Sequence, residues 1–319
     1  MPTLQSEEAR EGASMRATVT GGRGFLGSHV VDALQMRGVD VYVSSSAEHN
    51  LLSTDGRYWL IEETKPDVII HLAADVGGIG LNAEHPGRLF YNNAIMGLEL
   101  MELARTRGVE RFVSVGTACE YPAGAELLKE SRIWEGYPVH VTAAYGMAKK
   151  MVMVQGQVYR DEYGFDARHV IPTNLFGPRD HFDPEYGHVI PSIILKVAEA
   201  DRNDEDIVSL WGSGFATRDF LYVTDAAEGI ARACEVESLE GPVNLGSGIE
   251  TSIRQAAEEI ANQYGWNGLF AWDTSRPDGQ KRRVMSIDAA KELLDWEPST
   301  SLGWGIDRTI AWFEGMEDE

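Results

Sequence analysis

Short apolar runs alternate with amphipathic stretches through the first half of the chain. The runs at Arg16–Thr20, Val39–Val43 and Arg111–Val115 are rich in β-prone residues, and an amphipathic stretch spans Phe25–Arg37. The run Asp67–Leu72 is apolar almost throughout, which is typical of a strand buried on both faces. Strands that alternate with helices predict an α/β fold built on a doubly wound parallel sheet.

This alternation continues to about residue 173 and then fades. Helical patterns cover Ala94–Arg107 and Ala143–Glu162, and a fifth strand is predicted at Ala167–Ile171. Later runs are shorter and mixed, and prolines break up their first part, at Pro178, Pro184 and Pro191. We predict a first domain over residues 15–173 and a smaller lobe mainly over residues 174–319, with some segments returning to the first domain. Residues 1–14 are polar and aperiodic, which predicts a disordered extension.

Glycines recur at three-residue spacing directly after the first predicted strand, at Gly21, Gly24 and Gly27. Glycine permits a tight turn and lets a pyrophosphate approach the amino end of a helix, where N–H groups and the dipole attract anions. Such turns also serve only to pack a helix on a strand. The preceding strand and the α/β pattern that follows favour a dinucleotide cofactor, so the first domain is interpreted as a dinucleotide-binding domain.

The end of the second predicted strand distinguishes the two nicotinamide cofactors. A carboxylate there would bind the ribose 2′-hydroxyl of NAD, whereas a nearby arginine would bind the 2′-phosphate of NADP. The sequence has Ser44-Ser45-Ser46 at this place and Arg23 in the glycine turn. We expect NADP; the alternative interpretation of Arg23 is a solvent-facing loop residue.

Composition excludes several classes of partner. The net charge of −22 argues against nucleic acid, although a phosphorylated small molecule needs only a few local cations. No apolar run reaches the ~18 residues that span a bilayer, so we expect no membrane partner and a cytoplasmic location. The two cysteines, Cys119 and Cys234, fit a reducing compartment. No cluster of side chains has metal-ligand spacing, so no metal is expected.

The basic residues are mostly arginine. Only 7 of the 28 are lysine, and the other 21 are arginine. This acidic, lysine-poor composition fits either an adaptation to high salt or a GC-rich genome, and both interpretations stay open.

Tyr145 and Lys149 stand four residues apart, on one face of a predicted helix. A tyrosine has an ordinary pKa near ~10, and an ammonium one turn away, together with an oxidised nicotinamide ring, would bring that pKa closer to neutrality. The phenol could then protonate a carbonyl oxygen as a hydride reaches carbon. Exposed Tyr–Lys pairs are common on helix surfaces, but the glycine turn about 120 residues earlier makes this pair specific.

Together these motifs resemble the extended short-chain dehydrogenases/reductases, and more narrowly the GDP-L-fucose synthases, which are GDP-4-keto-6-deoxymannose epimerase-reductases. The resemblance covers the chain from Met15 to about Phe313. Besides the two motifs above, it rests on the segments HLAA (71–74), VGGI (76–79), GTACEYP (116–122), PTNLFGP (172–178), GHVIP (187–191), WGSG (211–214), RDFL (218–221) and PDG (277–279).

The resemblance implies two further catalytic side chains. In this family a cysteine and a histidine exchange protons at carbons 3 and 5 of the keto sugar, and Cys119 and His188 stand at the matching positions. Their ordinary pKa values, about 8.5 and 6.5, allow exchange near neutrality. Thr117 occupies the place of a serine that hydrogen-bonds the substrate carbonyl. Considered singly, the cysteine could be core packing and the histidine a loop residue.

The resemblance also assigns the binding positions. The expected cofactor contacts are Gly21, Arg23, Gly24, Phe25, Leu26, Gly27, Ser44, Asn50, Leu51, Ala73, Ala74, Tyr145, Lys149, Pro172, Asn174 and Leu175. The expected substrate contacts are Val76, Gly77, Thr117, Asn174, His188, Lys196, Trp211, Arg218 and Lys281. Arg218 would grip the diphosphate; otherwise it forms a salt bridge with Asp219 or Asp225. Trp211 would stack on a base or fill the core of the lobe, and Lys196 could be a solvated residue.

The expected reaction is NADPH-dependent 3,5-epimerisation and 4-reduction of a GDP-linked 4-keto-6-deoxy sugar, and similar enzymes are commonly homodimers. Thr117, Glu120 in place of an apolar residue, and a shorter loop from Tyr121 to Glu130 depart from the family pattern. They keep open a single-activity reductase or epimerase on another GDP-sugar, of heptose or colitose type. A 4,6-dehydratase would place acidic residues where Ala118 and Cys119 stand, and a non-catalytic scaffold would not need Tyr145 and Lys149.

Overall fold

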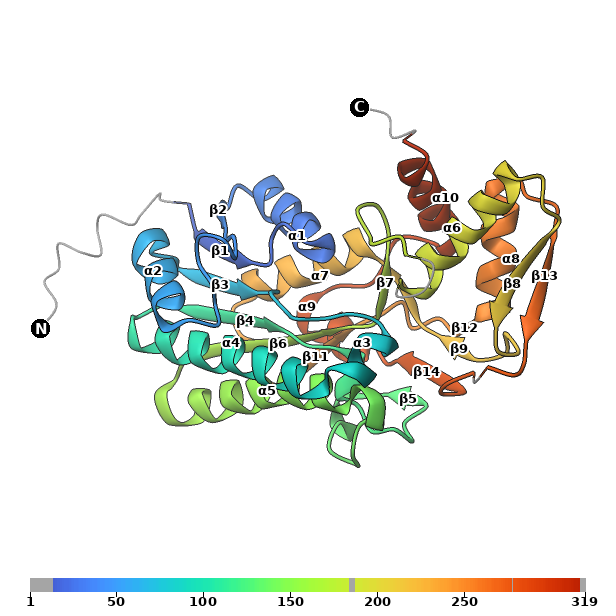
Figure 1. Ribbon diagram of the computed structural model, residues 1–319. Coiled ribbons are helices and arrows are strands. Elements are labelled where there is room, and N and C mark those ends of the chain that lie inside the picture. The colour runs from blue at the N-terminus through green and yellow to red at the C-terminus, as the bar shows by residue number, and fades with distance from the viewer. Residues whose placement is uncertain (1–13, 184–186, 277, 316–319) are drawn as a thin grey trace, which may run out of the picture.

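The computed structural model describes residues 14–183, 187–276 and 278–315. A six-stranded sheet, parallel throughout, runs through the larger part of the molecule in the order β11-β6-β4-β3-β1-β2 (Figure 1). Its strands are β1 (Arg16–Thr20), β2 (Asp40–Val43), β3 (Val68–His71), β4 (Arg111–Val115), β6 (Asp166–Pro172) and β11 (Pro242–Leu245). The doubly wound α/β fold is therefore confirmed. The extension predicted at residues 1–14 lies, except for Ser14, outside the described residues.

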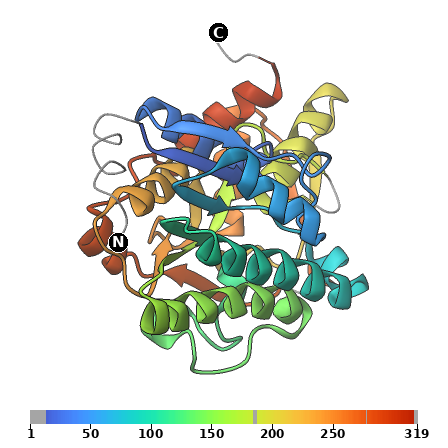
Figure 2. The ribbon, with the colours of Figure 1, turned by 90° about the vertical axis from the view of Figure 1, so that its left-hand side faces the viewer.

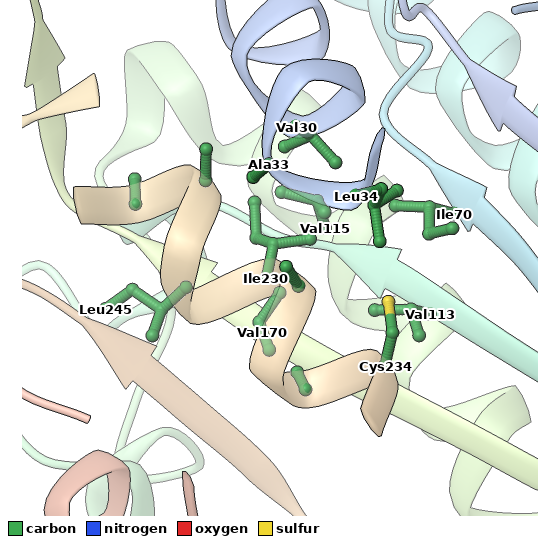
Figure 3. Packing of buried hydrophobic residues seen from close by; sticks show 14 of the residues in the cluster. Val30, Ala33, Leu34, Ile70, Val113, Val115, Val170, Ile230, Cys234 and Leu245 are labelled. Atoms are coloured by element: carbon green, nitrogen blue, oxygen red, sulfur yellow. The ribbon is translucent and has the colours of Figure 1, made fainter. Parts of the chain in front are cut away.

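Helices cover both faces of this sheet, as Figures 1 and 2 show from two sides. They are α1 (Phe25–Met36) and α7 (Val223–Glu235) on one face, and α2 (Thr54–Thr64), α4 (Pro86–Thr106) and α5 (Ala143–Tyr163) on the other. Alternate strand residues serve the two layers: Ile70 packs toward α1 and α7, whereas its neighbour Ile69 packs toward α4. Figure 3 shows the first of these cores, in which Ile230 of α7 and Leu34 of α1 belong to one cluster over the strands.

The second lobe has its own hydrophobic core, built from helices α6 (Val189–Arg202), α8 (Ile253–Tyr264) and α10 (Leu302–Phe313) and the paired strands β8 (Ile207–Trp211) and β13 (Leu269–Asp273). The sequence predicted that Pro191 breaks up this region, but Pro191 lies in the first turn of α6. A proline is tolerated there because the backbone N–H groups of a first turn have no partner within the helix.

Short strands connect the two parts. They are β5 (Leu127–Leu128), β7 (Asn174–Phe176), β9 (Thr217–Arg218), β10 (Phe220–Tyr222), β12 (Thr251–Ser252) and β14 (Arg282–Met285). The remaining helices are α3 (Ile79–Glu84) and α9 (Asp288–Leu294). In the part of the chain that the structure describes, no helix is both long and apolar enough to cross a membrane.

Candidate active site

A cavity of about 1050 Å³ opens along the carboxyl ends of β1, β3, β4 and β6. Its walls come from the loops that follow these strands, including the glycine turn, residues 72–78, residues 115–119 and residues 172–175. In doubly wound sheets this edge is where ligands bind, because loops from neighbouring strands meet there. Every position that the sequence assigns to the cofactor lines this cavity.

The glycine turn leaves no room for side chains on two of its residues. Gly21 has a φ of +73°, and a Cβ there would lie 2.7 Å from the backbone nitrogen of Ala73. A Cβ on Gly27 would lie 2.7 Å from the Cα of Gly22. Helix α1 begins at Phe25, and no side chain caps its amino end. Its N–H groups therefore suit a pyrophosphate.

Arg23 lines the cavity beside the end of β2, although its side chain is exposed. Its charge lowers the pKa of Tyr42 on β2, against the larger raising effects of burial and of Glu48. Ser44 follows β2 directly and also lines the cavity. A cation and hydroxyl groups at this place suit the ribose 2′-phosphate of NADP better than the ribose 2′-hydroxyl of NAD.

Tyr145 and Lys149 lie on the first turns of α5 and both face the cavity, so they are not the surface pair that the sequence allowed. Lys149 is only 5% exposed and forms no ion pair with any described residue. Burial lowers the pKa of its ammonium to about 8, against the opposing charge of Glu120. Burial also raises the pKa of Tyr145, and the negative charges of Cys119 and Glu120 add to this effect.

The sequence predicted a lowered tyrosine pKa for the site that also holds an oxidised nicotinamide ring, whereas the protein residues alone raise this pKa. Desolvation disfavours the phenolate more than the ammonium one turn away favours it. A phenol with a raised pKa stays protonated at neutral pH, which suits proton donation to a ketone oxygen.

Cys119 and His188 line the same cavity. Thr117 ends the loop after β4, and its hydroxyl accepts a hydrogen bond of 3.3 Å from the backbone N–H of Cys119. Cys119 is half-buried, whereas Cys234 is fully buried in the core, where burial raises its pKa to about 12. Cys234 is therefore the cysteine that packs in the core, whereas Cys119 lines the cavity.

His188 stands immediately before α6, at the mouth of the cavity. Its Nδ1 lies 3.5 Å from Oδ1 of Asp180, whose side chain is buried. Asp180 raises the pKa of His188 through this contact, which outweighs the lowering effect of burial. Because its pKa is raised, the imidazole of His188 is more often protonated near neutral pH, which suits it to give a proton to a substrate carbon.

Glu120 does not face the expected sugar site. Its side chain is fully buried, accepts a 2.8 Å hydrogen bond from the N–H of Thr117 and pairs with His169 on β6 at 3.1 Å. The departure at Glu120 therefore does not change which side chains line the cavity. A carboxylate can replace an apolar residue here because it finds a donor and a partner inside the protein.

The chain is similar to known enzymes over nearly its whole length. A family model described as "NAD dependent epimerase/dehydratase family" matches residues 17–246. A GDP-L-fucose synthase from Sinorhizobium fredii is 33% identical over 93% of this chain and 95% of its own length. The chain belongs to the GDP-L-fucose synthase family.

Two further proteins are similar to this chain. The crystal structure of a GDP-L-fucose synthetase from Naegleria fowleri bound to NADP has a TM-score of 0.87 and 30% identity, and the match covers 94% of this chain and 93% of that one. A GDP-L-colitose synthase from Yersinia pseudotuberculosis is 28% identical over 94% of this chain and 98% of its own length.

Four of the residues that the sequence assigns to substrate binding do not line the cavity. They are Lys196, Trp211, Arg218 and Lys281. Lys196 is half-buried on α6, and Lys281 is exposed just before β14. Trp211 is 57% exposed, with the guanidinium of Arg276 5.0 Å from its ring centre, so the alternative that it fills the lobe core is wrong.

Arg218 does not form the salt bridge that the sequence offered as an alternative. Its guanidinium donates to the carbonyl oxygens of Thr217 and Gln280, each at 2.7 Å. Asp219 instead accepts hydrogen bonds from the backbone N–H groups of Ser247, Gly248 and Met285. Within the described residues, Arg218 has no carboxylate partner at ion-pair distance.

The sequence interpretation missed Arg283. This residue lies opposite Arg218 in the register of β14 and β9, and its guanidinium donates to the carbonyl oxygen of Ala118, beside Cys119. Burial and the neighbouring charge of Arg283 lower the pKa of Arg218. The basic run at residues 281–283 was the available signal, and strand alternation turns its middle residue, Arg282, away to pair with Glu250.

Proposed function

We propose that this protein carries out NADPH-dependent 3,5-epimerisation and 4-reduction of a GDP-linked 4-keto-6-deoxy sugar, giving GDP-L-fucose or a close relative. One observation carries the proposal: Tyr145 and Lys149 line the same cavity as the thiol of Cys119 and the imidazole of His188. A reductase alone needs only the first pair. A thiol and an imidazole beside it add two groups that exchange protons near neutral pH.

The cofactor and the sugar nucleotide are assigned to different parts of the chain. Residues 15–173 hold NADPH through the glycine turn, with Arg23 on its 2′-phosphate, and residues 174–319 hold most of the GDP-sugar. Arg218 and Arg283 are neighbouring cations that lack carboxylate partners among the described residues, and such a pair suits a diphosphate. When bound, NADPH supplies the hydride for carbon 4.

Epimerisation uses the acidity of the carbons beside the ketone. Cys119, as a thiolate, removes the proton from carbon 3 or 5, and the electron pair of the broken C–H bond moves to the ketone oxygen as an enolate. Thr117 and Tyr145 donate hydrogen bonds to this oxygen. His188 returns a proton to the opposite face of the carbon, which inverts it. Arg283, whose guanidinium donates to the carbonyl oxygen of Ala118, lies beside this cysteine.

Reduction follows at carbon 4. Tyr145 gives its proton to the ketone oxygen while the hydride reaches carbon, and Lys149 stabilises the phenolate that remains. The raised pKa of Tyr145 keeps the phenol protonated before this step.

Two incubations test the proposal. GDP-4-keto-6-deoxymannose in deuterated water without NADPH should gain deuterium at carbons 3 and 5, and addition of NADPH should give GDP-L-fucose, identified by NMR. Cys119→Ser should reduce deuterium uptake by about 100-fold or more. Cys234→Ala, which removes the core thiol, should keep it. Failure of the unmodified protein to incorporate deuterium would exclude epimerisation.

A single-activity enzyme for a colitose- or heptose-type GDP-sugar remains the second candidate, and Thr117 is the observation that favours it. Threonine adds a methyl group to the wall of the cavity where the family carries serine. Assays with a panel of keto sugars separate the two candidates, because conversion of only the fucose precursor removes the second.

We also propose a cytoplasmic homodimer. Met151, Val154 and Val158 form an exposed apolar stripe on α5, at the spacing of one helix face. Pairing of this helix with its copy would bury the stripe. Val158→Glu should convert the dimer to a monomer in light-scattering measurements; an unchanged mass would exclude this interface. The free thiols of both cysteines fit the reducing cytoplasm.

A further inference from the structure

Two ionisable side chains lie directly behind the wall of the catalytic cavity. Glu120 is 0% exposed and His169 is 4% exposed, and Nε2 of His169 lies 3.1 and 3.3 Å from the two carboxylate oxygens of Glu120. Gly116, which lines the cavity, separates this pair from it. A Cβ on Gly116 would lie 2.5 Å from Nε2 of His169 and closer still to Glu120. Only one thickness of backbone therefore separates the pair from the cavity.

Hydrogen bonds fix both members of the pair. Glu120 accepts from the N–H of Thr117 at 2.8 Å, so its carboxylate holds the turn that carries Thr117 and Cys119. On the other side of the pair, Nδ1 of His169 lies 2.7 Å from the hydroxyl oxygen of Ser114. That hydroxyl also lies 3.0 Å from the carbonyl oxygen of Arg168.

These hydrogen bonds form a series from the carbonyl of Arg168 through Ser114 and His169 to Glu120, and the number of protons in the series is limited. If the hydroxyl of Ser114 donates to the carbonyl of Arg168, Nδ1 of His169 must carry a proton of its own. If the hydroxyl donates to Nδ1, Nε2 must carry the proton instead. In either arrangement a single proton lies between Nε2 and Glu120. The pair is neutral in the first arrangement and has one negative charge in the second.

A second cavity, of about 470 Å³, lies on the far side of His169. Ser114 and His169 line it, and exposed Asp161 and Glu240 lie at its border. Ser114 and His169 therefore also border a space outside the catalytic cavity.

Several charged groups face the pair or the side chains that it acts on. Lys149 and Lys150 of α5 are within the electrostatic reach of Glu120, and so is Tyr145. His71 of β3 faces Lys149 from the other side, and Cys119 faces Tyr145. Burial and Lys149 lower the pKa of His71 to about 3, so this imidazole is neutral and adds no positive charge beside Lys149.

We propose that Glu120 and His169 form a positioning pair in the second of these arrangements: Nε2–H of His169 donates to the Glu120 carboxylate, which holds the Thr117–Cys119 turn and keeps its negative charge within reach of Lys149. The inference deepens the proposed function, on which the role of Lys149 rests. It also accounts for an acidic residue where the family usually has an apolar one.

The sign of the effect follows from the charges. Burial lowers the pKa of Lys149 to about 8, and Glu120 opposes this; Glu120 also contributes to the raised pKa of Tyr145. Loss of the carboxylate charge should therefore lower both pKa values. Because reduction needs both groups protonated, the alkaline limb of the reductase pH profile should move to lower pH.

The decisive experiment measures Lys149 directly and needs no substrate. The chain has seven lysines, so [ε-13C]lysine NMR gives a simple spectrum, and Lys149→Arg identifies the Lys149 signal. In Glu120→Gln the titration midpoint of Lys149 should fall by about one pH unit. Glu126→Gln, which removes an exposed carboxylate from the same loop region, should leave it unchanged. An unchanged midpoint in folded Glu120→Gln protein would overturn the proposal.

A second measurement on the unmodified protein covers the case in which Glu120→Gln does not fold. Nitrogen-15 histidine NMR, with His169 assigned through its backbone, should show a proton on the Nε2 side that exchanges slowly and persists through neutral pH. An imidazole that titrates as if free in water would overturn the shared proton. Absence of turnover with GDP-4-keto-6-deoxymannose would instead count against the proposed function, since neither NMR experiment depends on the sugar.

Discussion

Helix α5 can hold Tyr145 over the cavity only because the next residue, Gly146, has no side chain. A Cβ on Gly146 would lie 2.7 Å from the carbonyl carbon of Cys119, and closer to its oxygen. Ordinary carbon–carbon contacts are about 3.5–4.0 Å, so Gly146→Ala must separate α5 from the catalytic turn by roughly 1 Å. Both obstructing atoms are backbone, and no side-chain rotation relieves the contact.

The magnitude follows from two opposed effects. Overpacking costs about 1–3 kcal/mol, and alanine in a helix interior recovers about 1 kcal/mol relative to glycine. The net loss of stability is about 0–2 kcal/mol, which lowers Tm by no more than roughly 8 °C. Activity should suffer more, because misplacement of a catalytic group by about 1 Å can reduce a rate by ~100-fold.

Gly156→Ala is the matched control, since it makes the same change on the same helix. Its Cβ would lie 3.1 Å from the Cβ of Ala167 and 3.7 Å from Cε of Met101, contacts that need only a small adjustment. We expect unchanged kcat and an equal or higher Tm. The assay compares the reductase kcat and the melting temperature of both variants. A Gly146→Ala protein with the kcat of the unmodified enzyme would refute the close approach of helix and turn.

Three other substitutions test single contacts. Arg23→Ala should weaken NADPH binding by about 10- to 100-fold, from a lost charge-assisted contact, and leave NADH binding nearly unchanged; equal effects on both cofactors in fluorescence titrations would contradict its role. Asp180→Asn removes the partner that raises the pKa of His188, so the alkaline limb of deuterium exchange at the sugar should move to lower pH, and an unmoved limb would contradict this assignment. Asp219→Asn should destabilise the fold by about 2–4 kcal/mol in urea unfolding, because a buried amide cannot accept every backbone N–H that the carboxylate accepts; a loss below ~1 kcal/mol would show that the network rearranges.

The elements of the first domain could be predicted where burial leaves a clear pattern. The fifth strand was predicted at Ala167–Ile171 and spans Asp166–Pro172, because its residues pack on both faces of the sheet. Helix α4 was predicted from Ala94 but begins at Pro86, since few side chains in its first turns are buried. Helix α2 gave no amphipathic pattern, because a glycine and an arginine are among its few buried residues.

Beyond residue 174 the strands have two to five residues and pair with distant partners, so no local pattern reveals them. The same limit applies to the site. Positions beside the strand ends could be predicted because the fold alone brings them together. The place of Arg283 beside Cys119 depends on the register of β14, and the burial of Glu120 depends on His169, which lies on another strand.

The last strand of the central sheet limits how this protein can be cut or recombined. Strand β11 pairs with β6 only after the chain has passed through β7, α6, β8 and α7. A fragment that stops at residue 173 would leave β6 as an unprotected edge, prone to pair with other chains. Exchange of substrate-binding segments between relatives should therefore treat residues 174–241 as an insertion with both ends fixed in the sheet.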